Sequence, residues 1–171
     1  MARALEGVGV AGVEIKWPND LQIRGAKLGG ILVEGGYSGS RYLASVGVGV
    51  NLIGVPPSVT DRELASVAAV SGSESEFSEL RSRLLSGYLG SLDEAESKAL
   101  LTPGVLLGEY RSLLSTTGRE VVVEMGDGAL AGMASGVDGQ GRLIVDTATG
   151  RRVVASGDVI HLRGAGGEKE A

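Results

Sequence analysis

Apolar and polar residues alternate in short runs over the first third of the chain, as they do in half-buried strands. Four runs carry this alternation: residues 13–16, 21–23, 27–34 and 41–52. Residues 24–26 predict a tight turn, and the glycine-rich residues 35–39 predict a loop. We therefore expect a sheet built from hairpins at the start of the chain.

The middle of the chain has helical spacing instead. Residues 1–7 look like the last turns of a helix that ends at glycine, and Thr60 predicts the N-cap of a short helix that reaches about Val70. A long amphipathic helix is predicted from residue 75 or 76 to about 92, with Lys98 as an alternative end. Its apolar face consists of Leu80, Leu84, Leu85, Tyr88 and Leu92. Pro103 suits the first turn of a last helix, which ends near residue 114.

The final third consists of short apolar runs separated by glycine turns, which is typical of a small β-barrel. The runs cover residues 119–125, 130–137, 143–146, 153–155 and 159–162. The sequence thus predicts an α+β fold, a mixed β-sheet packed with helices and followed by a small barrel. We expect domains at residues 1–115 and 116–163, with a disordered tail at 164–171.

Composition narrows the classes of function. The chain has 171 residues, 43% of them hydrophobic, so most of it is expected to fold around a core. The net charge of −5, without a basic stripe, argues against nucleic-acid binding. No run is apolar enough to span a membrane. With no cysteine and a single histidine, a zinc site or a His/Cys nucleophile is not expected, and the cytoplasm is the simplest compartment.

Glycines on one face of a strand are the first candidate for chemistry. Because side chains alternate, residues 46–51 place three valines on one face of the strand. The opposite face carries Gly47, Gly49 and Asn51. A flat ring or an acyl chain would fit this bare backbone, and the amide of Asn51 would suit the edge of adenine. Close packing of a helix onto the glycines explains the pattern equally well.

Charged residues near the first hairpin are the second candidate. Lys27, at a strand start, would stabilise negative charge on a carboxylate or phosphate, although a solvated hairpin lysine is the simpler interpretation. Asp20 would bind Mg²⁺ beside a phosphate or pair with an amine, but it also fits a plain turn aspartate. Trp17 is either a core residue or a wall of the pocket. His161 is expected to be structural. Residues 7–12 match G-x-G-x-x-G without the strand and helix that a dinucleotide site requires.

Three segments together resemble the biotin–protein ligases. Residues 16–20 read K-W-P-N-D, residues 27–34 read K-L-G-G-I-L-V-E, and residues 46–52 read V-G-V-G-V-N-L, each similar to a family motif and in the family's order. Residues 111–119 and 156–163 resemble the family's linker and the closing strand of its SH3-like C-terminal domain. The resemblance implies a fold like that of class II synthetases and biotin–lipoate ligases.

The resemblance also implies an activity, in which biotin and Mg-ATP form biotinyl-5′-AMP and a lysine of a biotin carboxyl carrier protein then accepts the biotin. Lys27 matches the essential lysine, which contacts both biotin and the α-phosphate. The implied biotin contacts are Lys27, Gly29, Gly30 and Ile31. The implied ATP contacts are Lys27, Asn51, Trp17 and Arg163. Asp20 would lie near the acceptor lysine or Mg²⁺ as a catalytic residue.

One family element is absent from the sequence. The family's Gly-Arg-Gly-Arg loop lies upstream of K-W-P-N-D, where this chain has only fifteen residues, and the chain also lacks a DNA-binding helix-turn-helix. We therefore expect part of a ligase, dependent on a separate N-terminal half, and an exposed sheet edge that would permit a homodimer. The alternatives are a non-catalytic or split-ligase subunit that binds the carrier protein or a partner half, and a lipoate-type ligase.

Overall fold

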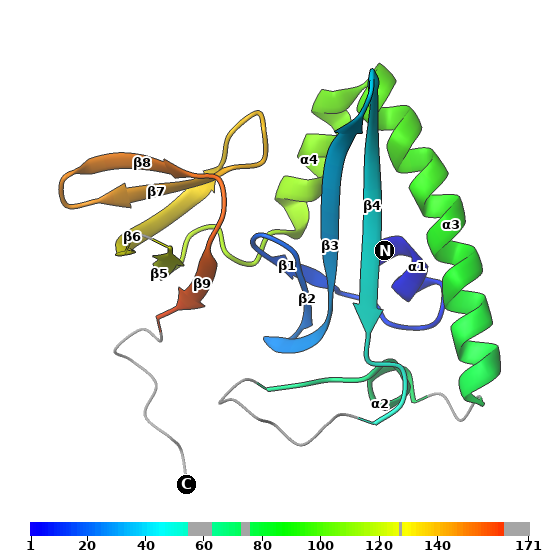
Figure 1. The fold of residues 1–171 in the computed structure, drawn as a ribbon. Coiled ribbons are helices and arrows are strands. Elements are labelled where there is room, and N and C mark those ends of the chain that lie inside the picture. Colours follow the sequence, from blue (N-terminus) through cyan, green and yellow to red (C-terminus); the bar gives the residue numbers. More distant parts are fainter. Residues whose placement is uncertain (55–62, 73–75, 127, 163–171) are drawn as a thin grey trace, which may run out of the picture. The chain divides into compact units, whose positions relative to one another are not determined.

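The computed structural model describes residues 1–54, 63–72, 76–126 and 128–162. Within these ranges the chain forms two compact units (Figure 1). The first unit contains Met1–Ile15 and Asn19–Thr102, and the second contains Lys16–Pro18 and the chain from Pro103 onward. A three-residue segment therefore belongs to the second unit, although its neighbours on both sides along the chain belong to the first.

The first unit is organised by a sheet in the order β1-β2-β3-β4. Its strands are β1 (Glu14–Lys16), β2 (Asp20–Ile23), β3 (Ala26–Ser38) and β4 (Arg41–Val50). The β2–β3 and β3–β4 pairings are antiparallel, and an isolated parallel bridge joins Lys27 to Leu64. The turn between β2 and β3 consists of Arg24 and Gly25, both with positive φ (50° and 83°), which matches the twist of a two-residue hairpin.

The β3–β4 hairpin is longer than the sequence predicted. Residues 35–38 continue β3 and are not the expected loop, because each of them pairs with a residue of β4. Of the two glycines there, Gly35 lies under a tyrosine ring, whereas a Cβ on Gly36 would meet nothing within 4 Å. A Cβ on Gly35 would overlap the Tyr42 ring as it lies here, so a larger residue would require that exposed ring to turn away. Tyr42 in turn contacts Tyr37 edge to face, with ring centroids 5.1 Å apart.

Three helices accompany this sheet: α1 (Ala2–Glu6), α2 (Val67–Ser71) and α3 (Phe77–Leu101). The predicted helix from Thr60 to Val70 is wrong over residues 63–66, where the backbone is extended and pairs beside β3. Ser66 is the actual N-cap and accepts a hydrogen bond from the Ala69 amide at 3.4 Å. The predicted cap, Thr60, lies outside the described residues.

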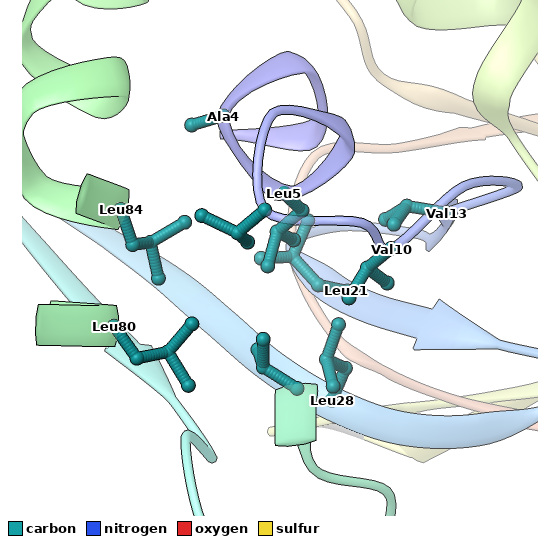
Figure 2. Packing of buried hydrophobic residues seen from close by; sticks show 10 residues of the cluster. Ala4, Leu5, Val10, Val13, Leu21, Leu28, Leu80 and Leu84 are labelled. Carbon is teal, nitrogen blue, oxygen red and sulfur yellow. The ribbon is translucent and has the colours of Figure 1, made fainter. Parts of the chain in front are cut away.

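The core of the first unit lies where α1 and α3 meet the sheet. Leu5, Leu21, Leu28, Leu80 and Leu84 point toward one another in Figure 2, and all of them are buried. On α3 only part of the predicted apolar face is covered, since Leu85 is 49% and Leu92 38% exposed. One side of the long helix therefore keeps apolar surface in solvent.

The second unit consists of α4 (Pro103–Leu113) and a five-stranded sheet. The strands are β5 (Glu120–Met125), β6 (Gly128–Val137), β7 (Leu143–Thr147), β8 (Gly150–Val154) and β9 (Asp158–His161). They are antiparallel in the order β8-β7-β6-β5-β9, and no pairing of β8 with β9 occurs among the described residues. Alternate residues such as Val121 and Val123 are fully buried, as expected for small-barrel strands.

These two units confirm the predicted α+β class, with a helix-packed sheet followed by a small all-β module. The proposed boundary at residues 115 and 116 stays a prediction, since α4 packs with the second unit. Among the described residues no helix is both long and apolar enough to cross a membrane.

Candidate active site

A lysine and an aspartate form the chemical centre of the first unit. The ammonium of Lys27 lies 2.5 Å from Oδ1 of Asp20 and donates a hydrogen bond to it. The two side chains are only 33% and 17% exposed, so this pair is more shielded than an ordinary surface salt bridge. The sequence-predicted residues Lys27 and Asp20 are therefore brought together.

The register of the hairpin explains why these two meet. A bulge between Leu21 and Gln22 shifts the β2–β3 pairing, so that Asp20 stands opposite Gly30. Asn19 fixes the start of β2, because its carbonyl accepts from the Ile31 amide at 3.0 Å and its side-chain amide donates to the Ile31 carbonyl at 2.7 Å. Asn19 was not singled out from the sequence, where only its turn propensity was visible.

A strip of bare backbone borders this ion pair. Gly30 stands opposite Gly49, and Leu32 stands opposite Gly47. A Cβ on Gly30 would lie 3.4 Å from Oδ1 of Asp20 and 4.0 Å from the Lys27 ammonium, whereas one on Gly49 would meet nothing within 4 Å. We call this surface the glycine face: Gly30, Gly47, Gly49 and the Lys27–Asp20 pair. It provides an open floor at Gly30 and Gly49, with one cation and one anion at its margin and the exposed Leu32 side chain opposite Gly47.

Gly29 and Ile31 belong to the opposite face of the same strand. A Cβ on Gly29 would overlap the Gly49 carbonyl, so glycine is needed there for the two strands to approach. The Ile31 side chain stands opposite Val48 and packs against the hydrophobic core. The structure therefore does not bring the Ile31 side chain onto the glycine face.

Asn51 holds the end of β4 in place. Its side-chain amide donates to the Ala65 carbonyl at 3.0 Å and to the Lys27 carbonyl at 3.5 Å. Its backbone amide donates to Leu28, and its carbonyl accepts from Val67. Both backbone and side chain thus connect β3, β4 and the segment before α2, which explains an asparagine here without any ligand. The predicted contact with adenine stays a prediction.

Trp17 lies in the second unit and is buried, with 2% of its surface exposed. Its indole N–H donates to the Gly141 carbonyl and its backbone N–H donates to Oγ1 of Thr116, both at 2.9 Å. Of the two roles considered for this residue, the structure supports the core residue. A contact with ATP stays a prediction, as does that of Arg163, which lies outside the described residues.

His161 is a half-buried member of the same cluster. Its Nε2 lies 3.2 Å from Oγ1 of Thr116. Burial, together with the positive charges of Lys16 and Arg119, lowers the pKa of His161 from 6.5 to about 4. The ring is therefore neutral near pH 7, in keeping with the structural role expected of it.

A second hollow lies on the other face of the sheet. It measures about 850 Å³ and is lined mainly by apolar side chains of β4 and α3. We call it the apolar groove: Val46, Val48, Val50, Phe77, Leu84, Leu85 and Tyr88. Its described lining includes Arg81 but no ion pair like Lys27–Asp20. We therefore assign the chemistry to the glycine face.

Comparison with known proteins adds two family matches. Residues 1–51 match the biotin/lipoate A/B protein ligase family, and residues 116–162 match the biotin protein ligase C terminal domain. Across both regions, the chain is 34% identical over 153 residues to a biotin–[acetyl-CoA-carboxylase] ligase of Mycobacterium tuberculosis. That alignment covers 87% of this chain. Both matched regions of the chain are thus similar to biotin–protein ligases.

Solved structures of biotin–protein ligases support the same fold. The apo enzyme from Aquifex aeolicus superposes with a TM-score of 0.68 at 22% identity, covering 95% of this chain and 74% of that one. The same enzyme in complex with biotin and ATP gives a TM-score of 0.66 at 20% identity, covering 95% and 72%. The alignment with the Mycobacterium tuberculosis ligase covers 53% of that relative, so the chain spans about half the length of the protein it matches.

Proposed function

We propose that this chain carries the lysine-containing part of a biotin–protein ligase site and attaches biotin to a carrier protein at the expense of ATP. The observation that carries the proposal is the Lys27–Asp20 pair, 2.5 Å apart at the margin of the glycine face. Similarity to known proteins supports the reaction class, because relatives that match most of this chain's length are named as biotin ligases. That naming does not favour the lipoate alternative.

In the first half-reaction, an oxygen of the biotin carboxylate attacks the α-phosphorus of ATP. A P–O bond forms, the bond to the β-phosphate breaks, and pyrophosphate leaves with the electron pair. Negative charge accumulates on the α-phosphate oxygens. We assign its stabilisation to the Lys27 ammonium, which Asp20 already holds in place. A preorganised cation of this kind typically lowers the activation barrier by about 3–4 kcal/mol.

In the second half-reaction, the neutral amine of a carrier lysine attacks the biotinyl carbonyl of the mixed anhydride. An amide bond forms, the bond to the phosphate oxygen breaks, and AMP leaves with the electron pair. We assign the proton released from the amine to the Asp20 carboxylate, through Oδ2, the oxygen that does not face Lys27. Asp20 would also attract the incoming lysine while it is still charged.

The remaining substrate contacts follow from the shape of the glycine face. The acyl chain of biotin would lie along Gly49, where a Cβ would meet nothing within 4 Å, and reach Gly30 beside the Lys27–Asp20 pair. Gly29 supports this floor from behind by allowing β3 and β4 to approach, and Ile31 contributes through its backbone. For ATP we retain Asn51, through its carbonyl oxygen Oδ1, and Arg163 as proposed contacts.

Magnesium fits these residues only as an ion shared with the nucleotide. The described residues contain no group of three or more His, Cys, Asp or Glu side chains that would hold a metal. Mg²⁺ commonly binds through one carboxylate together with substrate phosphates, and Asp20 offers one oxygen for that arrangement. The ion would neutralise phosphate charge, while Lys27 and Asp20 perform the roles assigned above.

A transfer assay tests the proposal. The chain is incubated with biotin, Mg-ATP and a biotin carboxyl carrier domain, with and without the part of the Mycobacterium tuberculosis ligase that it does not match. We expect weak biotinylation alone, recovery with the added part, and loss with Lys27→Ala. Lys98→Ala is the matched control, since Lys98 pairs with Glu94 on α3 at 2.8 Å. No biotinylation under any condition would refute the proposal.

The apolar groove favours a second candidate, a subunit that binds a partner half of a ligase. In the described part of the chain, β4 is an edge strand of ten residues, and the groove beside it leaves Val46 41% and Phe77 55% exposed. An open edge next to apolar surface is a docking site for another polypeptide, including a second copy of this chain. Size-exclusion chromatography with the unmatched part of the relative distinguishes a heterodimer from a homodimer.

One variant separates the partner-binding role of the apolar groove from catalysis at the glycine face. Val48→Asp places a charge in the apolar groove and leaves the glycine face intact. It should abolish binding of the partner half and the recovered transfer together. If the chain is active on its own, its basal transfer should survive Val48→Asp. We keep the cytoplasm as the expected compartment for either function.

A further inference from the structure

The backbone of Lys27 is held by a later segment of the first unit. Its N–H donates to the Glu63 carbonyl at 2.8 Å, and its carbonyl accepts from the Ala65 amide at 2.9 Å. These two bonds form the parallel bridge between Lys27 and Leu64. Both backbone groups of the lysine assigned to the α-phosphate are therefore bonded to residues 63–65.

Asn51 stands where β4 stops pairing with β3. The last pair of that ladder joins Gly29 to Val50. The Asn51 amide then donates to the Leu28 carbonyl at 2.9 Å, and the Asn51 carbonyl accepts from the Val67 amide at 2.8 Å. The backbone of Asn51 is therefore fixed both to β3 and to the start of α2.

The side chain of Asn51 connects these two supports. Its Nδ2 donates to the Ala65 carbonyl at 3.0 Å and, more weakly, to the Lys27 carbonyl at 3.5 Å. The two N–H groups of an amide match two carbonyls, whereas an aspartate or leucine side chain of similar size has no N–H to donate. We call this arrangement the backbone clamp of Lys27: Asn51, Glu63 and Ala65.

The bulge in the β2–β3 ladder explains why Lys27 needs this support. The pairing shifts between Leu21 and Gln22, and this shift leaves Leu28 unpaired with β2 in the described register. The Leu28 carbonyl bonds to the Asn51 amide instead. Because the regular ladder is interrupted next to Lys27, the backbone clamp takes the place of pairing with β2.

We infer that Asn51 is a positioning residue, which holds the backbone of Lys27 through Ala65 while Asp20 holds the ammonium at the other end of the side chain. A lysine fixed at both ends loses much of its rotamer freedom before any substrate binds. The inference rests on the proposed function, because it explains how Lys27 is preorganised for the α-phosphate. All the contacts involved lie within the first unit.

Residue-resolved hydrogen exchange tests the backbone clamp without any substrate. Asn51→Ala removes both side-chain bonds, and we expect it to speed exchange at the Lys27 and Ala65 amides by about tenfold. The reference is the Gly9 amide, bonded to the Glu6 carbonyl at 3.0 Å in the same unit, which should stay within about twofold. Unchanged exchange at Lys27, or equal acceleration at Gly9, would overturn the inference.

Ser82→Ala is the matched control. It also deletes a side-chain donor to a backbone carbonyl of the first unit, that of Ser78 on α3 at 2.8 Å, and should leave exchange at Lys27 and Ala65 unchanged. Should Asn51→Ala fail to fold, Asn51→Asp gives the same outcomes in hydrogen exchange, because it keeps the shape of the side chain and lacks its N–H groups.

A double-mutant cycle distinguishes positioning of Lys27 from a separate role of Asn51. The readout is biotin-dependent exchange of pyrophosphate into ATP by the complemented chain. Saturating biotin and Mg-ATP are used, because losing a contact that binds ground and transition states equally raises KM alone. We expect Asn51→Ala to lower this rate by about tenfold in the wild-type chain but by no more than about twofold in Lys27→Met. Equal factors in both would show that Asn51 does not act through Lys27.

The two measurements separate this inference from the proposed function. A wild-type chain without pyrophosphate exchange, but with the expected hydrogen exchange at Lys27, would refute only the proposed function. An Asn51→Ala chain with the wild-type rate of pyrophosphate exchange would refute only the inference.

Discussion

Gly29 and Gly49 approach so closely across β3 and β4 that no side chain fits at Gly29. A Cβ there would overlap the Gly49 carbonyl and lie 3.1 Å from the Cα of Val50. Because both obstacles are backbone, they cannot rotate away. The close approach also brings Gly30 and Gly49 level with each other, which creates the open floor beside Lys27 and Asp20.

Gly29→Ala should therefore destabilise the first unit. The added methyl group pushes the two strands apart, and overpacking of this kind typically costs about 1–3 kcal/mol. Urea unfolding followed by circular dichroism measures the change in the free energy of unfolding. Unchanged stability would show that β3 and β4 are further apart than described.

Gly49→Ala is the matched opposite case. A Cβ at this position meets nothing within 4 Å, so the free energy of unfolding should change by no more than about 0.5 kcal/mol. The methyl group would, however, stand on the glycine face, where the acyl chain of biotin is proposed to lie. Calorimetric titration of the complemented chain with biotin should show weaker binding. Unchanged affinity would show that biotin does not bind on the glycine face.

Much of the site could be predicted from the sequence because it is local. Asp20, Lys27 and Gly30 lie within eleven residues, and a hairpin turn between them brings any such residues together. Alternation along residues 46–50 likewise predicted that Gly47 and Gly49 share a face, as the register confirms.

What the sequence missed depends on contacts between distant segments. Trp17 bonds to a carbonyl 124 positions along the chain, and nothing near residue 17 indicates that partner. The sequence suggested that the Asn51 side-chain amide binds adenine, but its N–H groups donate to the carbonyls of Ala65 and Lys27. Residues 35 and 36 were predicted as a loop from their glycines, because their pairing partners, Ala44 and Leu43, lie on the other strand.

The stability of the second unit should depend on pH through His161. Its pKa is about 4 in the folded chain and near 6.5 when unfolded. Above 6.5 both states are neutral and stability is complete. As pH falls from 6.5 toward 4, only the unfolded state takes up the proton, so the free energy of unfolding decreases. Because the ring is only half-buried, we expect a loss of about 1–2 kcal/mol.

The comparison with His161→Gln isolates this effect. The variant should lack the part of the pH dependence that lies between 6.5 and 4, whereas carboxylates that titrate lower affect both proteins alike. Thermal unfolding across that window measures the difference. Parallel curves for the two proteins would show that His161 is not held neutral by its surroundings.

Asp20→Asn should separate the two half-reactions. The amide keeps the shape of the carboxylate but cannot take a proton from the acceptor lysine. We expect transfer from preformed biotinyl-5′-AMP to slow by about 100-fold, a typical general-base contribution. Formation of the adenylate should fall less, because Lys27 keeps its charge. Single-turnover measurements give the rate of each step. Equal losses in both rates would show that Asp20 has no specific role in the transfer step.

The central claim is that the Lys27 ammonium stabilises charge on the α-phosphate. The most direct measurement is biotin-dependent exchange of pyrophosphate into ATP by the complemented chain, which isolates adenylate formation from the carrier protein. Lys27→Met keeps the apolar stem and removes the charge, and we predict that it lowers the exchange rate by about 100- to 1,000-fold while Lys98→Met has no effect. Equal exchange rates in the two variants would contradict the account.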